Sequence, residues 1–252
     1  MRIWVALLLI AVAACETAPI TGRSQLMIVP EGTEVQMGLE SYQQILGKSK
    51  LSTDAKLSEQ VNRVGRRIAE ATGRLDYQWE FKLIEDKQVN AFCLPGGKVA
   101  VYTGILPVTR DDAGLAAVLG HEVAHAVARH GGERMSQQLA VEGVTVAAAQ
   151  TALAGRDPRI IQLGTVALGA GATLGVLMPW GRAQESEADR LGLIYMAKAG
   201  YHPSAARDLW VRMGEGSKNS QPEFLSTHPL PATRVAQIEG WIPEALKYYK
   251  PR

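Results

Sequence analysis

The chain has 252 residues, of which 46% are hydrophobic and 21% charged, the composition of a globular protein that buries a core. Its length allows one domain of about 200 residues with a leader, or two small domains. The formal net charge is only +2 and the basic residues form no long cluster, so the sequence offers no electrostatic case for binding nucleic acid.

The first 14 residues have the pattern of a secretory signal peptide, in which a positively charged start precedes an uncharged apolar run. The run, residues 3–14, is too short to span a bilayer, which takes about 20 helical residues. The sequence VAAC at residues 12–15 resembles a bacterial lipobox, which predicts a lipid on Cys15; the alternative is an ordinary signal peptide cleaved nearby. Because Glu16 is not the aspartate associated with inner-membrane retention, we expect a lipoprotein on the periplasmic face of the outer membrane.

The next segment, residues 15–50, is polar and contains several Gly and Pro. It is expected to form a tether and a short helix ahead of a main domain at 51–252. A helix is predicted from Ser52 to about Gly73, because four apolar residues follow the spacing of one helical face: Leu57, Val61, Val64 and Ile68. Alternation of apolar with charged residues predicts a strand at 78–84.

Two further elements precede the centre of the chain. Two β-prone runs within residues 89–103 flank a Pro-Gly-Gly turn signal and predict a β-hairpin. Asp111 or Asp112 can cap a helix that runs to about His130, with the glycines at 131 and 132 as its stop.

That helix carries the most informative motif, H-E-x-x-H at residues 121–125. Because residues four apart share one face of a helix, His121 and His125 can bind the same metal ion. Zinc suits two imidazoles in a site that keeps one position open for chemistry. Glu122 lies beside them, placed to take a proton from a metal-bound water.

Residues 139–178 are rich in Ala, Gly, Val and Leu, and residues 160–180 contain no charge. Four glycines weaken the hydrophobicity of that uncharged stretch. We therefore expect a buried or lipid-grazing helical hairpin, with a membrane-spanning helix as the alternative.

Helices are also predicted in the C-terminal part. One covers 184–199 and ends at Gly200, and another begins at Pro203, a favoured first helical position. A Gly-, Ser- and Asn-rich loop is expected at 214–220. A His-Pro loop at 226–234 leads into a last helix that stops at Gly240.

A catalytic zinc site needs a third protein ligand. Glu185 and Asp189 are four residues apart and share a helical face, so Glu185 can bind the metal while Asp189 orients a ligand histidine through its other ring nitrogen. The competing ligand is Glu187, which lies about 200° around the helix from Glu185 and would face solvent.

The pattern H-E-x-x-H followed by E-x-x-x-D resembles the gluzincin metallopeptidases. The flanking segments are similar to the branch that contains HtpX, the CAAX prenyl proteases, the mitochondrial Oma proteases and the periplasmic BepA-type proteases. The matching segments are Val89–Gly97, Gly120–Ala126, Glu185–Gly192 and Thr227–Arg234. The chain looks more like the lipoprotein members, without the helical-repeat domain of BepA-type proteins.

This resemblance implies an α+β, predominantly helical, zincin-like metallopeptidase domain at 51–252 that binds one Zn²⁺. It implies a small β-sheet whose edge strand flanks the active-site helix and pairs with an extended polypeptide substrate, through Asn90, Ala91 and Phe92. His228 is implied to reach the zinc or the reacting carbonyl, where it would either stabilise the oxyanion or keep the enzyme latent. Arg234 is expected to position that loop or to pair with an acid.

The resulting hypothesis is a lipid-anchored zinc endopeptidase for misfolded or unassembled cell-envelope proteins. The alternative is an envelope assembly factor or chaperone, a partner of the assembly machinery, whose protease site is mostly latent. A third hypothesis is a zinc-binding structural lipoprotein, against which the intact H-E-x-x-H motif argues.

Overall fold

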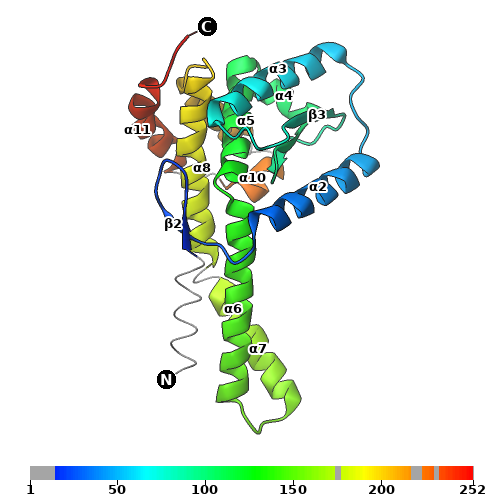
Figure 1. The fold of residues 1–252 in the computed structure, drawn as a ribbon, viewed down its shortest axis with the longest axis vertical. Coiled ribbons are helices and arrows are strands. Elements are labelled where there is room, and N and C mark those ends of the chain that lie inside the picture. The colour runs from blue at the N-terminus through cyan, green and yellow to red at the C-terminus, as the bar shows by residue number, and fades with distance from the viewer. Residues whose placement is uncertain (1–14, 174–176, 217–222, 230–232, 252) are drawn as a thin grey trace. The chain divides into compact units, whose positions relative to one another are not determined.

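The computed structural model describes residues 15–173, 177–216, 223–229 and 233–251. The chain divides into two compact units. We call Met1–Glu31 with His130–Gln184 the hairpin unit, and Gly32–Arg129 with Glu185–Arg252 the core unit. The predicted α+β, predominantly helical class is confirmed (Figure 1). The predicted signal peptide, residues 1–14, lies outside the described residues.

A three-stranded sheet organises the core unit. Its strands are β3 (Glu80–Ile84), β4 (Ala91–Leu94) and β5 (Lys98–Tyr102), in the order β3-β5-β4. The predicted strand and hairpin are confirmed, since β4 and β5 are antiparallel and β3 is parallel to β5. The hairpin turn uses Gly96 and Gly97, whose φ angles of 82° and 85° strain any residue with a Cβ. The strand β4 is an edge strand, and it packs against the helix that carries H-E-x-x-H.

Helices cover both faces of this sheet. On one face, α3 (Ala55–Thr72) and α5 (Asp112–Val127) bury the main core, and the predicted apolar stripe of α3 is confirmed by its buried residues. On the other face, Tyr42 of α2 (Glu31–Lys48) packs in a smaller cluster with Ile84 and Ala100. The prediction of a short helix in 15–50 is wrong, because α2 is 18 residues long. A helix that must cover a sheet face needs this length.

The predicted end of the helix that carries H-E-x-x-H is wrong. The helix α5 ends at Val127, and the glycines at 131 and 132 lie inside α6 (His130–Ala152). Between α5 and α6, Arg129 has a left-handed backbone with a φ of 55°, and its guanidinium pairs with the buried Glu34. A left-handed conformation costs free energy for a residue with a Cβ, and the ion pair with Glu34 can offset that cost.

The C-terminal helices are longer than predicted. The helix α8 spans Met178–Lys198, and α9 spans Ser204–Gly216, so only residues 217–220 of the expected loop are left, outside the described residues. The short α10 (Glu223–Thr227) occupies the start of the expected His-Pro loop. The last helix, α11 (Arg234–Leu246), continues through Gly240, where a side chain would meet nothing within 4 Å. An isolated glycine therefore did not stop this helix.

The core unit also contains a 3₁₀ turn, η1 (Thr103–Ile105), and α4 (Leu106–Thr109), which join β5 to α5. The Asp111 side chain caps α5 by accepting from the Gly114 N–H at 2.8 Å. Of the two predicted capping residues, Asp111 is therefore the N-cap.

In the hairpin unit, α6 packs against α7 (Pro158–Ala172), which confirms the predicted helical hairpin. The expectation that it is buried is wrong for α7, which has no buried residue. Among the described residues, no helix combines the length and apolar character needed to cross a membrane. The described part of the uncharged stretch 160–180 contains most of α7 and the start of α8.

The N-terminal segment is attached to α6 rather than being a simple tether. Its strands β1 (Cys15–Thr17) and β2 (Ser24–Leu26) form an antiparallel pair. The carboxylate of the buried Glu133 accepts hydrogen bonds from Arg23 at 2.6 and 2.7 Å, from Gln25 at 3.3 Å and from Gln184 at 2.7 Å. This buried polar cluster fixes the N-terminal strands to α6 within the hairpin unit.

Candidate active site

The site is built where α5 meets α8 (Figure 1). A Cβ on Gly120 would lie 2.8 Å from the carbonyl oxygen of Gly192, and a Cβ on Gly192 would lie 2.9 Å from the backbone of Gly120. Only glycine at both positions allows this approach of the two backbones. It brings the H-E-x-x-H turn of α5 against the turn of α8 that carries Glu185 and Asp189. Both glycines lie inside the segments that carry the family resemblance, but the sequence alone does not reveal that they contact each other.

Four side chains converge on one point: His121, His125, Glu185 and His228 have ligand atoms that lie within 4.8 Å of one another. The Nε2 atoms of His121 and His125 are 3.1 Å apart, and the Glu185 carboxylate lies 3.4 and 3.2 Å from them. Two ligands at 2.0–2.1 Å from a tetrahedral zinc stand about 3.3 Å apart. The donor set and its spacing therefore fit zinc, as the sequence predicted for the first three residues.

Glu187 does not join this cluster. The expectation that it faces solvent is wrong, because its exposed fraction is only 6%. This part of α8 is buried on more than one face, so a residue on the face opposite Glu185 is not exposed to solvent. The structure nevertheless places Glu185, and not Glu187, with the two histidines of α5.

Asp189 and Arg234 support the cluster from behind. The Nδ1–H of His121 donates to Asp189 at 2.9 Å, the contact expected for a residue that orients a ligand imidazole. Arg234 is 2% exposed and donates to both carboxylate oxygens of Asp189 at 2.8 Å. It also donates to the carbonyl oxygens of His228 and Pro229 at 3.3 and 2.8 Å. Arg234 thus pairs with an acid and holds the His-Pro loop, the two roles between which the sequence left it open.

His228 bridges the metal donors and the base. Its Nδ1 lies 3.1 Å from His121 Nε2 and 3.0 Å from the Glu185 carboxylate. Its Nε2 lies 3.3 Å from Oε1 of Glu122. That oxygen is buried and has no hydrogen bond within the described part of the chain. In this structure His228 therefore stands where a fourth ligand would stand, next to the carboxylate expected to act as the base.

The electrostatics of these groups follow from burial and from their neighbours. Burial raises the pKa of Glu122 above its ordinary value, so this carboxylate takes up a proton more readily. Burial alone would lower the pKa of His121, but the carboxylates of Asp189 and Glu185 outweigh it and raise that pKa to about 9. The pKa of Asp189 is lowered, because Arg234 and His121 outweigh its burial. The pKa of Glu185 is lowered, because the imidazoles of His121, His125 and His228 outweigh its burial.

The predicted substrate strand, β4, is an edge strand of the sheet formed by the described residues. Tyr102 N–H donates to the Asn90 carbonyl, so the alternation of an antiparallel pair directs the peptide groups of Ala91 and Cys93 to the outer edge. The Asn90 side chain already accepts from Ala91 N–H at 2.9 Å. The Phe92 side chain instead packs in the cluster of Tyr42 on the other face, so it contributes to the core and not to the edge.

Two aromatic residues that the sequence did not reveal complete the site. The Phe224 ring lies 4.6 Å from that of His228, and its N–H donates to the Val89 carbonyl, just before the edge strand. Trp210 lies under the guanidinium of Arg234, with 3.5 Å between Cζ and the ring centre. A lone aromatic residue carries no sequence signal of such a role.

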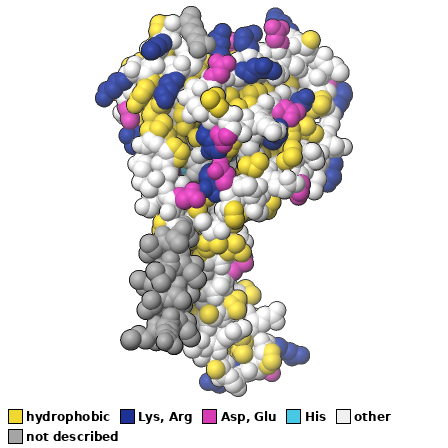
Figure 2. Space-filling view, in the orientation of Figure 1, with side chains coloured by type: hydrophobic (Ala, Val, Ile, Leu, Met, Phe, Trp, Pro, Cys, Tyr) yellow, Lys and Arg dark blue, Asp and Glu magenta, His cyan; other side chains and the backbone are white. Residues whose placement is uncertain are grey.

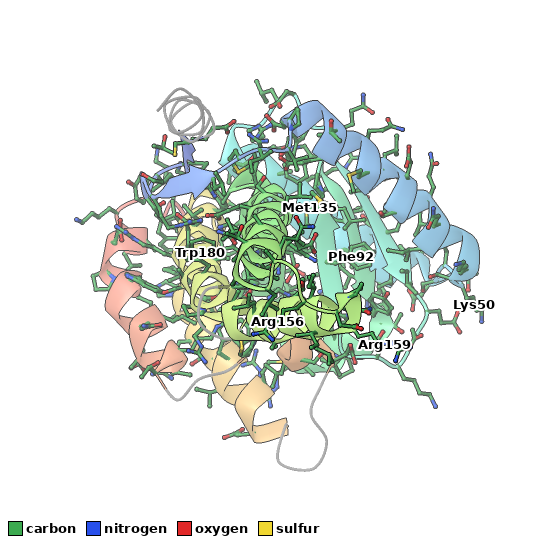
Figure 3. The ribbon with its side chains drawn as sticks, turned by 90° about the horizontal axis from the view of Figure 1, so that it is seen from below. Lys50, Phe92, Met135, Arg156, Arg159 and Trp180 are labelled. Atoms are coloured by element: carbon green, nitrogen blue, oxygen red, sulfur yellow. The ribbon has the colours of Figure 1, made fainter. Side chains whose placement is uncertain are left out.

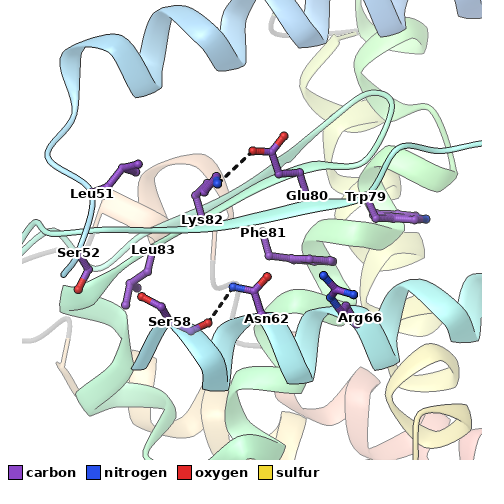
Figure 4. Close-up of a pocket in the computed structure, with 10 residues that line it drawn as sticks. All are labelled: Leu51, Ser52, Ser58, Asn62, Arg66, Trp79, Glu80, Phe81, Lys82 and Leu83. Atoms are coloured by element: carbon purple, nitrogen blue, oxygen red, sulfur yellow. Dashed lines mark hydrogen bonds and ion pairs between the residues drawn. The ribbon is translucent and has the colours of Figure 1, made fainter. Parts of the chain in front are cut away.

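A separate hollow of about 400 Å³ lies between α3 and β3 (Figure 4). It is lined by Ser58, Asn62 and Arg66 from the helix and by residues of the strand such as Phe81 and Lys82. None of its lining residues belongs to the metal-binding group, so it is not part of the catalytic centre.

Comparison with known proteins agrees with this geometry. The model of peptidase family M48 matches residues 55–242. The mitochondrial metalloendopeptidase OMA1 of Schizosaccharomyces pombe is 39% identical over 236 residues, which cover 91% of this chain and 67% of the relative. OMA1 of Saccharomyces cerevisiae is 32% identical over 93% of this chain and 71% of the relative. The beta-barrel assembly-enhancing protease of Escherichia coli K12 is 28% identical over 90% of this chain and 47% of the relative. Together with the donor cluster, these matches show that the chain belongs to peptidase family M48 and is a zinc-dependent metalloendopeptidase.

Proposed function

We propose that this protein is a lipid-anchored endopeptidase that cleaves extended segments of misfolded or unassembled envelope proteins, at the periplasmic face of the outer membrane. The observation that carries the proposal is the buried donor cluster with Glu122 beside it, next to an open strand edge. The lipobox at Cys15 and the E. coli relative, named as a beta-barrel assembly-enhancing protease, support the envelope location.

In this proposal His121, His125 and Glu185 hold the zinc ion, which supplies Lewis acidity and an activated water when it is bound. Asp189 keeps the His121 ring in the tautomer that turns Nε2 toward the metal. Glu122 accepts the proton of the attacking water and delivers it to the leaving amine. Its buried, raised-pKa carboxylate suits both steps.

The substrate would add as a strand to the outer edge of β4, where the peptide groups of Ala91 and Cys93 face outward. Main-chain pairing holds a polypeptide whatever its side chains, which suits a protease for unfolded clients. The Asn90 amide, which covers Ala91 N–H in this structure, would have to release it.

The position of His228 favours a latent state of this enzyme. Its imidazole lies against His121, Glu185 and Glu122, so in this position it would keep water and a substrate carbonyl from reaching the donors and the base together. In the alternative role, stabilising the oxyanion, the His228 ring would lie beside the reacting carbonyl and not in its place.

The test is casein cleavage by the chain and by Glu122→Gln, with zinc content measured in parallel. The proposal expects Glu122→Gln to keep its zinc and to lose cleavage by at least about 100-fold. A chelator should abolish the activity of the unaltered chain. Undiminished cleavage by the zinc-loaded variant would refute the role of Glu122.

The second candidate is an assembly factor that holds clients at the edge of β4 and rarely cuts them, and the position of His228 against Glu122 favours it. Complementation of a deletion strain separates the two. Rescue by Glu122→Gln equal to that by the unaltered chain would show that holding, and not cutting, is the function.

A further inference from the structure

The hairpin unit exposes an apolar stripe along α7. Leu163, Val166 and Ile160 have exposed fractions of 70%, 65% and 47%. With Ala167 and Ala170 they fall within an arc of about 120° around the helix. Figure 2 shows hydrophobic side chains on this hairpin and charged ones gathered at its tip. We call the five residues the α7 stripe.

Several features point to a lipid surface as the occupant of the α7 stripe. No charged residue occurs from Ile160 to Trp180. Two cations, Arg156 and Arg159, stand at the tip of the hairpin (Figure 3), and Trp180, 41% exposed, lies just beyond its other end. Apolar side chains on one helical face, basic residues beside them and a tryptophan at one end are typical of helices that lie in a membrane interface.

The dimensions decide how such a helix would lie. With 15 residues, α7 is about 22 Å long, short of the roughly 30 Å hydrocarbon core. Insertion tip first would also bury Arg156, Asp157 and Arg159 in lipid, at a cost of several kcal/mol. Lying flat, the same helix places the α7 stripe in the acyl boundary and the arginines among the headgroups.

The proposed lipid anchor belongs to the same compact unit. Cys15 is exposed in β1, and β1 is paired with β2. Shortly after β2, Ile28 and Val29 donate their N–H groups to the Ser136 hydroxyl of α6 at 2.9 and 3.2 Å. An acyl chain on Cys15 would therefore hold the unit that carries the α7 stripe at a membrane surface.

We propose that the α7 stripe is a second membrane contact, which lies in the interface of a phospholipid bilayer containing anionic headgroups. The part that concerns anchoring rests on the lipidation proposed above, while the contact itself does not require it. Together the two contacts would fix the orientation of the hairpin unit on the membrane, which a single flexible anchor cannot do.

The test uses the full chain with Cys15→Ser, which cannot be lipidated, and its flotation with vesicles of phosphatidylethanolamine and phosphatidylglycerol. We expect binding, and a loss of roughly tenfold or more when Leu163→Glu and Val166→Glu are added. The matched control adds the same charges at exposed apolar residues of the core unit, Leu75→Glu and Val211→Glu, and should bind as before.

Casein cleavage is measured for each variant and should be retained, because the changes lie outside the metal site. Loss of vesicle binding with cleavage retained therefore tests the membrane contact separately from the proteolytic function. The proposal is overturned if the Cys15→Ser chain does not bind vesicles, or if both double variants lose binding equally. It is also overturned if light scattering shows a dimer that only Leu163→Glu with Val166→Glu dissociates, since the stripe would then be covered by a second copy.

Discussion

Replacement of His228 by alanine removes the imidazole from the fourth ligand position while leaving the other donors in place. If this ring keeps the enzyme latent, His228→Ala should be more active than the unaltered chain. If it stabilises the oxyanion, the variant should be less active. The same substitution therefore gives opposite signs for the two roles.

The magnitude follows from the contacts that hold the ring. The bond between His228 and the Glu185 carboxylate contributes about 1.5–3 kcal/mol, and the ring contact with Phe224 about 0.5–1.5 kcal/mol. Ordering the loop opposes them by about 1–2 kcal/mol for each residue fixed. A net preference of about 1–3 kcal/mol for the closed position corresponds to about 5- to 150-fold activation when the ring is removed.

The assay is kcat/KM for a fluorogenic peptide at saturating zinc, because loss of a fourth ligand also weakens metal binding. His202→Ala, which removes an exposed imidazole away from the site, is the matched control and should leave kcat/KM unchanged. A fall of about 100- to 1,000-fold in His228→Ala would refute latency and assign the residue to the oxyanion. An unchanged rate would refute both roles.

Three further predictions concern the supports of the site and of the hairpin unit. Asp189→Asn should lower zinc affinity by about 10- to 100-fold with the fold retained, as measured against graded chelators, and unchanged affinity would contradict its orienting role. Gly192→Ala should destabilise the chain by about 1–3 kcal/mol in thermal unfolding and weaken zinc binding, because its Cβ meets the Gly120 backbone, whereas Gly240→Ala should be neutral or stabilising. Burial alone would raise the pKa of Glu133, but hydrogen bonds from an arginine and glutamines lower it below 4.5. Stability from this group is therefore present above about pH 4.5 and is lost as pH falls through the lowered pKa. Hydrogen exchange of α6, after correction for the intrinsic pH dependence of exchange, should increase as pH falls below about 4.5, and Glu133→Gln should remove that dependence; if the variant retains it, another group is responsible.

Much of the site could be predicted from the sequence because its parts are local. His121 and His125 are one helical turn apart, as are Glu185 and Asp189, so periodicity alone placed each pair on one face. The β-hairpin followed from two β-prone runs around a Pro-Gly-Gly turn, whereas its edge strand was implied by the family resemblance. These signals depend on residues within a few positions of one another.

Helix ends were predicted less well, because competing contacts from distant residues decide them. The end of α5 is followed by the left-handed Arg129, whose side chain pairs with Glu34, 95 residues earlier in the chain. Gly240 is a helix interior residue because nothing around it requires a turn.

The amino-acid sequence by itself predicted the metal and the class of reaction, and it named three candidate donors and a candidate base, because these depend on residue types at helical spacing. Only the tertiary structure decided how the two halves of the motif meet, through the contact of Gly120 with Gly192, and where His228 stands. It also decided that Arg234 joins Asp189 to the His-Pro loop and that the α7 stripe is left exposed. Contacts between segments 40 to 110 residues apart are set by the packing of the whole core, and no local pattern encodes them.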